Sequence, residues 1–126
     1  MKMLKTLILA LILPSLAIAS EPWTKTEVAL EAAYQVALVV DWKQTSEFHR
    51  TILPGENRVM KEMNPILGSH PSQGAINLTC LVSAVGHYLV SDSLNHKNRL
   101  RWQGATAMIE MSFVAHNYKL GVRVKW

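Results

Sequence analysis

The sequence contains a single cysteine, Cys80, and this scarcity excludes two kinds of exported protein. No intramolecular disulfide can form, which excludes a small secreted fold held together by disulfides. Cys80 lies inside an apolar run, far from the N-terminal segment, so it is not a lipoprotein attachment site. We expect it to be a small, inert side chain within a packed structure.

The sequence motifs of common enzyme classes are also missing. There is no Gly-rich phosphate loop, no Gly-x-Ser-x-Gly elbow, no HExxH helix and no CxxC pair. No basic-aromatic motif for binding nucleic acid occurs either. No catalytic residue can therefore be assigned, and we expect no cofactor, no metal ion and no nucleic-acid partner.

Residues 1–19 have the three parts of a secretory signal peptide. Two lysines come first, an apolar run covers 7–16, and Ala-Ile-Ala ends the segment at residue 19. The rest of the chain, 20–126, is predicted to be a single domain in the bacterial envelope. If the signal is not cleaved, it adds a further helix to that domain.

Little net charge remains beyond the signal segment. Two of the thirteen basic residues lie in that segment, so the remainder of the chain has eleven Lys and Arg and nine Asp and Glu. This balance is too even to indicate a nucleic-acid partner. Basic residues cluster at Lys97, Arg99 and Arg101, where we expect a solvated loop; contact with anionic lipid head groups is the alternative.

Three apolar segments follow the signal, and each is predicted to be a helix. They cover residues 24–45, 75–90 and 100–116, and the first opens with the capping-box pattern Thr24-x-x-Glu27. Their apolar runs of thirteen to seventeen residues are shorter than the roughly 20 that a membrane span needs. Tilt, flanking tryptophans and local bilayer thinning can compensate for the difference.

Each predicted helix carries one thin polar stripe on an otherwise apolar surface. The stripes consist of Glu27, Glu31 and Gln35; Ser83, His87 and Ser91; and Gln103, Glu110 and Asn117. A helix on the surface of a soluble protein has the reverse pattern. The stripes therefore indicate an all-α bundle in the inner membrane, with polar faces turned toward one another and lipid outside. A soluble periplasmic helical domain is the alternative.

Two motifs surround the segment between the first two helices. The first motif, D-W-x-Q-T, covers residues 41–45 (Asp41-Trp42-Lys43-Gln44-Thr45), and the second, E-x-N-P-x-L-G-x-H-P-S, covers residues 62–72. The chain resembles, in these motifs and over nearly all of residues 20–126, a family of small membrane-associated proteins of bacteria and their phages. The resemblance implies a helical architecture, an envelope location and a phage or prophage origin. It implies no reaction, ligand or catalytic residue.

The polar residues of these motifs and helices are the candidates for a functional or structural cluster. They are Asp41, Thr45, Glu62, Asn64, His70, His87 and Glu110. Our main interpretation is structural: hydrogen bonds from the motif residues would tie the intervening loop to the helix end, because polar groups near a bilayer need internal partners. We likewise expect His87 and Glu110, as ionisable groups on apolar helices, to face the interior and pair with each other or with backbone groups; a proton or ion path is the alternative.

The leading functional hypothesis is a non-enzymatic membrane protein that contacts the lipid bilayer and packs with a membrane-protein partner or with copies of itself. The alternative is a small enzyme or ion-binding protein at the membrane face that uses Asp41, Glu62, His70 and Glu110. With His87 and His116 these residues have the ligand types of a metal or acid–base cluster. They are, however, scattered over three elements without a metal-binding spacing.

Overall fold

A computed structural model describes residues 20–47, 67 and 71–124 of the chain. It shows an all-α bundle and, within those residues, no β-strand. The helices are α2 (Lys25–Glu47), α3 (Gln73–Ser93) and α4 (His96–Lys119). The predicted signal segment lies outside the described residues.

The three helices are longer than the apolar runs that predicted them. They contain 23, 21 and 24 residues, and at about 1.5 Å per residue each is about 31–36 Å long. The hydrocarbon core of a bilayer is roughly 30 Å thick. Among the described residues α3 alone is both long and apolar enough to span a membrane.

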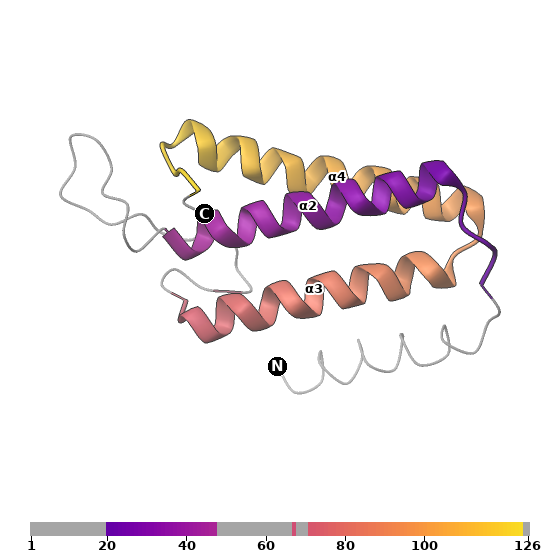
Figure 1. Ribbon diagram of the computed structural model, residues 1–126, viewed down its shortest axis with the longest axis horizontal. Helices are drawn as coiled ribbons and strands as arrows, with labels where there is room; N and C mark the ends of the chain where they lie inside the picture. Colours follow the sequence, from indigo (N-terminus) through magenta and orange to yellow (C-terminus); the bar gives the residue numbers. More distant parts are fainter. Residues whose placement is uncertain (1–19, 48–66, 68–70, 125–126) are drawn as a thin grey trace.

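The helices run up, down and up, as Figure 1 shows, so that α2 and α4 are parallel and α3 is antiparallel to both. The closest packing is between α2 and α4, while α3 packs mainly against α2. A short turn at Leu94 and Asn95 joins α3 to α4. The first turns of α2 and α4 therefore lie beside the last turn of α3.

The helix starts have the caps that the sequence indicates. The backbone N–H of Thr24 donates to the Glu27 carboxylate at 2.6 Å, and the Glu27 N–H donates to the Thr24 hydroxyl at 3.2 Å. These two bonds are the predicted capping box. Ser72 and Asn95 cap α3 and α4 through their side chains, at 3.1 and 3.0 Å from backbone N–H groups.

The end of α4 is closed by a glycine turn. Gly121 has a φ of 93°, which a residue without Cβ adopts at little cost. The N–H of Val122 donates to the carbonyl of Asn117, and that of Gly121 to Tyr118, at 3.1 and 3.0 Å. This is the Schellman pattern, which satisfies the last carbonyls of a helix.

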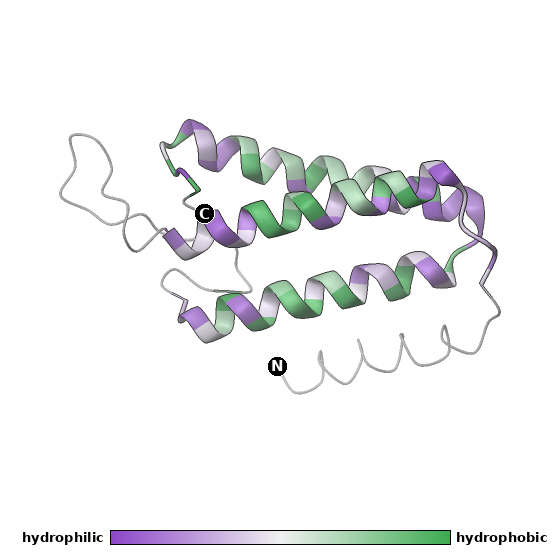
Figure 2. Cartoon of the chain, in the orientation of Figure 1, coloured by the Kyte–Doolittle hydropathy of each residue, from purple (hydrophilic) through white to green (hydrophobic). Residues whose placement is uncertain are grey.

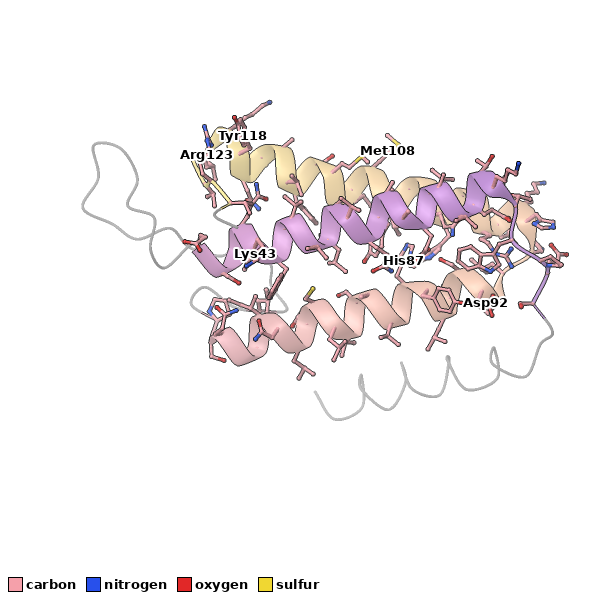
Figure 3. All side chains as sticks on the ribbon, in the orientation of Figure 1. Lys43, His87, Asp92, Met108, Tyr118 and Arg123 are labelled. Carbon is pink, nitrogen blue, oxygen red and sulfur yellow. The ribbon has the colours of Figure 1, made fainter. Side chains whose placement is uncertain are left out.

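The bundle is polar inside and apolar outside. Ten polar or charged residues of the described chain are buried, and they include Glu27, Arg99 and Gln103 at 0 % exposure. The apolar interior is a small cluster around Tyr34, Leu38 and Ala107. Large apolar side chains instead face outward, and in Figure 3 Met108 points away from the bundle.

The predicted polar stripes are therefore confirmed as interior faces. The buried residues include Glu31, His87, Ser91, Glu110 and Asn117. Figure 2 shows hydrophobic and hydrophilic positions alternating along every helix, as expected when each helix has one polar and one apolar face. The inward face is the polar one in all three.

Candidate functional site

Glu31 is the centre of a buried hydrogen-bond network between the three helices. Its carboxylate accepts from Gln35 Nε2 at 2.8 Å, from His87 Nδ1 at 3.0 Å, from the Ser91 hydroxyl at 3.0 Å and from Gln103 Nε2 at 3.1 Å. Glu31 is 7 % exposed. Four donors compensate the loss of hydration that burial of a carboxylate otherwise makes costly.

His87 completes this central network and is enclosed on both faces. Its Nδ1 faces the Glu31 carboxylate, and its Nε2 lies 2.7 Å from the Thr106 hydroxyl. The ring stacks on Tyr34 with 3.6 Å between centroids and on Trp102 with 5.2 Å. Figure 3 shows the side chain pointing into the bundle.

The expected pairing of His87 with Glu110 is wrong, because His87 pairs with Glu31 instead. Gln103 is the residue of α4 that joins Glu31. Glu110 comes two helical turns later, which corresponds to roughly 10 Å along the axis. The relative height of α3 and α4 thus places Glu110 beyond the reach of the imidazole.

Thr106, His87 and Glu31 form a hydroxyl–imidazole–carboxylate series, the order found in activated nucleophiles. The Thr106 hydroxyl, however, also lies 2.7 Å from the carbonyl of Trp102, to which it donates within α4. Tyr34 and Trp102 cover the two faces of the imidazole. The hydroxyl and the imidazole are thus already engaged in contacts within the bundle, and these contacts join α2, α3 and α4.

A second buried polar group, which we call the end cluster, consists of residues at the α3–α4 turn and at the start of α2. Its centre is Arg99, which is 0 % exposed. Arg99 donates through Nε to the carbonyl of Ser91 at 2.7 Å, and through Nη2 to those of Asp92 and Leu94 at 3.2 and 2.8 Å. The guanidinium thereby caps the C-terminus of α3.

The same guanidinium binds the start of α2. Its Nη1 lies 3.3 Å from the Glu27 carboxylate, and Trp23 stacks at 5.0 Å from Cζ. Trp23 in turn donates to the Asp92 carboxylate at 2.8 Å. The expectation that Arg99 is a solvated loop residue is therefore wrong, whereas its basic neighbours Lys97 and Arg101 are exposed.

Glu27 lies in the first turn of α2, before the apolar run of that helix. Burial opposes its ionisation, but hydrogen bonds from Thr24 and His96 and the charge of Arg99 outweigh this effect and lower its pKa from 4.5 to about 2. The His96 ring nitrogen is 2.9 Å from the carboxylate. Glu27 is thus ionised in the folded chain at all ordinary pH values.

This low pKa predicts that the free energy of unfolding depends on pH in the acid range. Because the pKa is lower in the folded chain than in the unfolded chain, Glu27 stabilises the fold above its ordinary pKa of 4.5, and this contribution disappears as pH falls from about 5 toward 2. Glu27→Gln is expected to be less stable than wild type at pH 7 and nearly equal to it near pH 2. Unfolding curves of both proteins across this range measure the difference, and parallel curves would contradict the assignment.

A third feature is a small cavity between the C-terminal halves of α2 and α4 and the N-terminal half of α3. Three of the candidate residues from the sequence, Asp41, Thr45 and Glu110, line it. Asp41 accepts a hydrogen bond from Asn117 of α4 at 2.9 Å. Asp41 and Thr45, which lie one helical turn apart on α2, thus line the same cavity as Glu110 of α4.

The other candidates are distributed differently. Glu62, Asn64 and His70 lie outside the described residues, and His116 is exposed. Within the described part of the chain, no group of three or more His, Cys, Asp or Glu side chains is arranged to hold a metal ion. Cys80 is partly buried against the apolar cluster.

The outer surface of the bundle has an apolar groove along α2 and α4. Its volume is about 790 Å³, and alanines form most of its α2 wall. The lining includes Ala29, Ala33 and Ala37 of α2 with Met111, Val114 and Tyr118 of α4. Small side chains of this kind let another helix approach closely.

Three residues with clear roles were missed by the sequence reasoning. Arg99 caps α3, Thr106 binds His87, and Tyr34 stacks on the imidazole. A signal existed for Arg99: α3 has no basic residue in its last turn and no glycine after it, so a cap from elsewhere was needed.

Comparisons of the chain with protein-family models, with curated proteins and with solved structures found no match.

Proposed function

We propose that the chain is an integral protein of the bacterial inner membrane, without enzymatic activity, that acts through contacts with other membrane helices. The observation that carries this proposal is the distribution of side chains. The described residues bury ten polar groups and expose large apolar ones, among them Leu78 at 62 %, Val82 at 61 % and Met108 at 71 %.

A soluble bundle would lose stability by this arrangement. Burying a large apolar side chain contributes about 1.5–3 kcal/mol in water, and the bundle forgoes this contribution along the outer face of each helix. In a bilayer the same face is solvated by lipid, and the polar interior provides the hydrogen bonds that hold the helices together. The soluble periplasmic domain is therefore the less favoured form.

The apolar groove supports the proposed mode of action. A groove walled by small side chains is a surface on which a transmembrane helix can pack, either of a partner protein or of a second copy of the chain. The enclosed central network supports the non-enzymatic part, since the imidazole has both faces covered and both nitrogens engaged. We also propose a phage or prophage origin, because the D-W-x-Q-T and E-x-N-P-x-L-G-x-H-P-S motifs resemble those of the family named above.

Extraction of cell membranes tests the insertion. The wild-type chain is expected to stay in the pellet after alkaline carbonate and to dissolve in detergent. A variant with Leu78→Asp and Val82→Asp is expected to leave the membrane, because each charge costs roughly 2.5–3.5 kcal/mol at the centre of a span.

The double variant separates the two forms of the protein. Both positions are exposed in the bundle, so these substitutions would leave a soluble helical domain folded and improve its solubility. Wild-type chain in the carbonate supernatant, with the variant equally folded and soluble, would contradict membrane insertion. A conservative Leu78→Ile, Val82→Leu variant is the matched control and should fractionate as wild type.

A further inference from the structure

The apolar groove along α2 and α4 has a polar end. Of the side chains that line it, only those of Tyr118 and Lys119 contain nitrogen or oxygen, and both residues belong to the last turn of α4. The rest of the lining consists of alanine, valine and methionine. The groove therefore suits a molecule that is apolar along most of its length and polar at one end.

Arg123 adds a second positive charge at this end. Its guanidinium Cζ lies 3.8 Å from the centre of the Tyr118 ring, and its Nη1 donates to the Tyr118 carbonyl at 2.7 Å. Figure 3 shows these two side chains together at the end of α4, away from Met108. Lys119 and Arg123 are both exposed, and neither forms an ion pair with another described residue. Their charges are thus open to an anion from outside the bundle.

These two charges lie at the level expected of a membrane interface. Between Arg101 and Lys119, none of the exposed residues of α4 is Asp, Glu, Lys or Arg. The two basic residues are about 27 Å apart along the helix at about 1.5 Å per residue, close to the roughly 30 Å of a hydrocarbon core. Lys119 is therefore level with the lipid head groups when α4 spans a bilayer, and the groove runs from it into the hydrocarbon.

Charge also distinguishes between the possible occupants of the groove. Lys43 and Glu47 at the end of α2 have opposite charges, so Lys119 and Arg123 leave this part of the described surface positive. A second copy of the chain on a two-fold axis would bring its own Lys119 and Arg123 against the same end, where like charges repel. An anionic lipid head group is instead attracted by basic side chains at the membrane surface.

We propose that the groove binds one anionic phospholipid, with the phosphate held by Lys119 and Arg123 and an acyl chain lying along Ala115, Met111 and the alanines of α2. Arginine can bind two phosphate oxygens at once through its planar fork, and lysine contributes a further charge. The inference goes beyond the proposed function and rests on it, because only an inserted chain presents the groove to lipid. A partner helix that packs in this groove would displace the lipid.

Native mass spectrometry of the detergent-purified chain tests the head-group site, with phosphatidylglycerol and phosphatidylcholine of identical acyl chains as competing probes. Wild type is expected to bind one phosphatidylglycerol with a preference of roughly 25-fold, since each basic residue beside the head group favours an anionic lipid about fivefold. The double variant Lys119→Gln, Arg123→Gln should lose this preference. The double variant Lys97→Gln, Arg101→Gln removes the same charge from exposed residues near the start of α4, and as the matched control it should keep the preference.

A second pair of variants tests the position of the acyl chain. Ala115→Phe places a bulky side chain in the groove. It should weaken phosphatidylglycerol binding about tenfold, the effect of displacing roughly two methylene groups of the lipid from apolar contact, while its helical circular dichroism is unchanged. Ala105→Phe is the control, because Ala105 is exposed on α4 but does not line the groove, and it should bind as wild type does.

The results that would overturn the proposal are distinct from those that concern membrane insertion. Equal binding of the two lipids by folded wild type, or a preference that survives Lys119→Gln, Arg123→Gln, would overturn the head-group site. Equal binding by Ala115→Phe and Ala105→Phe would show that the acyl chain lies elsewhere, and a lipid-free dimer of wild type would assign the groove to a second copy. None of these results changes the carbonate extraction, which tests insertion on its own.

Discussion

Replacement of Glu31 by alanine is expected to lower the free energy of unfolding by roughly 3–5 kcal/mol, because each buried donor left without its acceptor costs about 1–3 kcal/mol and several donors lose theirs together. The substitution removes the acceptor of four hydrogen bonds at once. His87, Ser91 and Gln103 would each keep a polar atom in the interior without its main partner, and α2, α3 and α4 would lose their common point of attachment.

Unfolding in mixed micelles of a mild detergent and sodium dodecyl sulfate measures this effect. Met108→Ala is the control, because Met108 is 71 % exposed and points away from the bundle, and it should change stability by no more than about 0.5 kcal/mol. A Glu31→Ala protein as stable as Met108→Ala would show that the bundle is not held together by its polar interior.

A double-mutant cycle locates the origin of the loss. Much of the cost of Glu31→Ala is the imidazole left unpaired, and His87→Ala removes that imidazole. The double variant Glu31→Ala, His87→Ala should therefore be less destabilised than the sum of the two single variants, with a coupling of about 0.5–3 kcal/mol. Simple additivity would mean that the contact at 3.0 Å contributes little.

The polar stripes were predictable because helical periodicity places residues four or seven apart on one face. Glu27 and Glu31 on α2, His87 and Ser91 on α3, and Gln103 on α4 are all buried as that spacing indicates. The Thr24–Glu27 capping box was predictable for a similar reason, since its two hydrogen bonds join residues only three apart. Such features depend on the geometry of a single helix.

The partners across helices were not predictable in the same way. Whether His87 meets Glu31 or Glu110 depends on the axial offset between neighbouring helices, which the period of one helix does not contain. The offset is set by caps and turns, such as the short connection at Leu94 and Asn95. The cavity shared by Asp41 and Glu110 depends on the same offset, since these residues are far apart in sequence.

Arg99 shows a further limit of sequence reasoning. Lys97, Arg99 and Arg101 look alike as a basic cluster, but alternate residues of a helix point in different directions. Only Arg99 faces the last carbonyls of α3, and only it is buried among the three. The composition of the cluster indicated solvent or lipid head groups, whereas the need of α3 for a cap determined the outcome at one position.

Replacement of Arg99 by alanine is the second substitution with a large expected effect, again about 3–5 kcal/mol of unfolding free energy. It leaves the Glu27 carboxylate buried at 0 % exposure without its guanidinium partner. It also leaves the carbonyls of Ser91, Asp92 and Leu94 without the donor that caps them. The end of α3 would separate from the start of α2.

Unfolding in mixed micelles and amide hydrogen exchange measure this loss together. Exchange should quicken most in the last turn of α3 and the first turn of α2, which the guanidinium joins. Lys97→Ala is the matched control: it removes a neighbouring basic residue that is exposed, and it should change stability by less than about 0.5 kcal/mol.

Arg99→Lys distinguishes the charge of Arg99 from its shape. Lysine keeps a positive charge near Glu27 but has one nitrogen in place of the planar fork that reaches four carbonyls and a carboxylate. We expect most of the destabilisation of Arg99→Ala to persist in Arg99→Lys, because the carbonyls at the end of α3 need several donors in fixed directions. Full recovery of stability by lysine would mean that attraction to Glu27, and not the capping of α3, is what makes this buried arginine necessary.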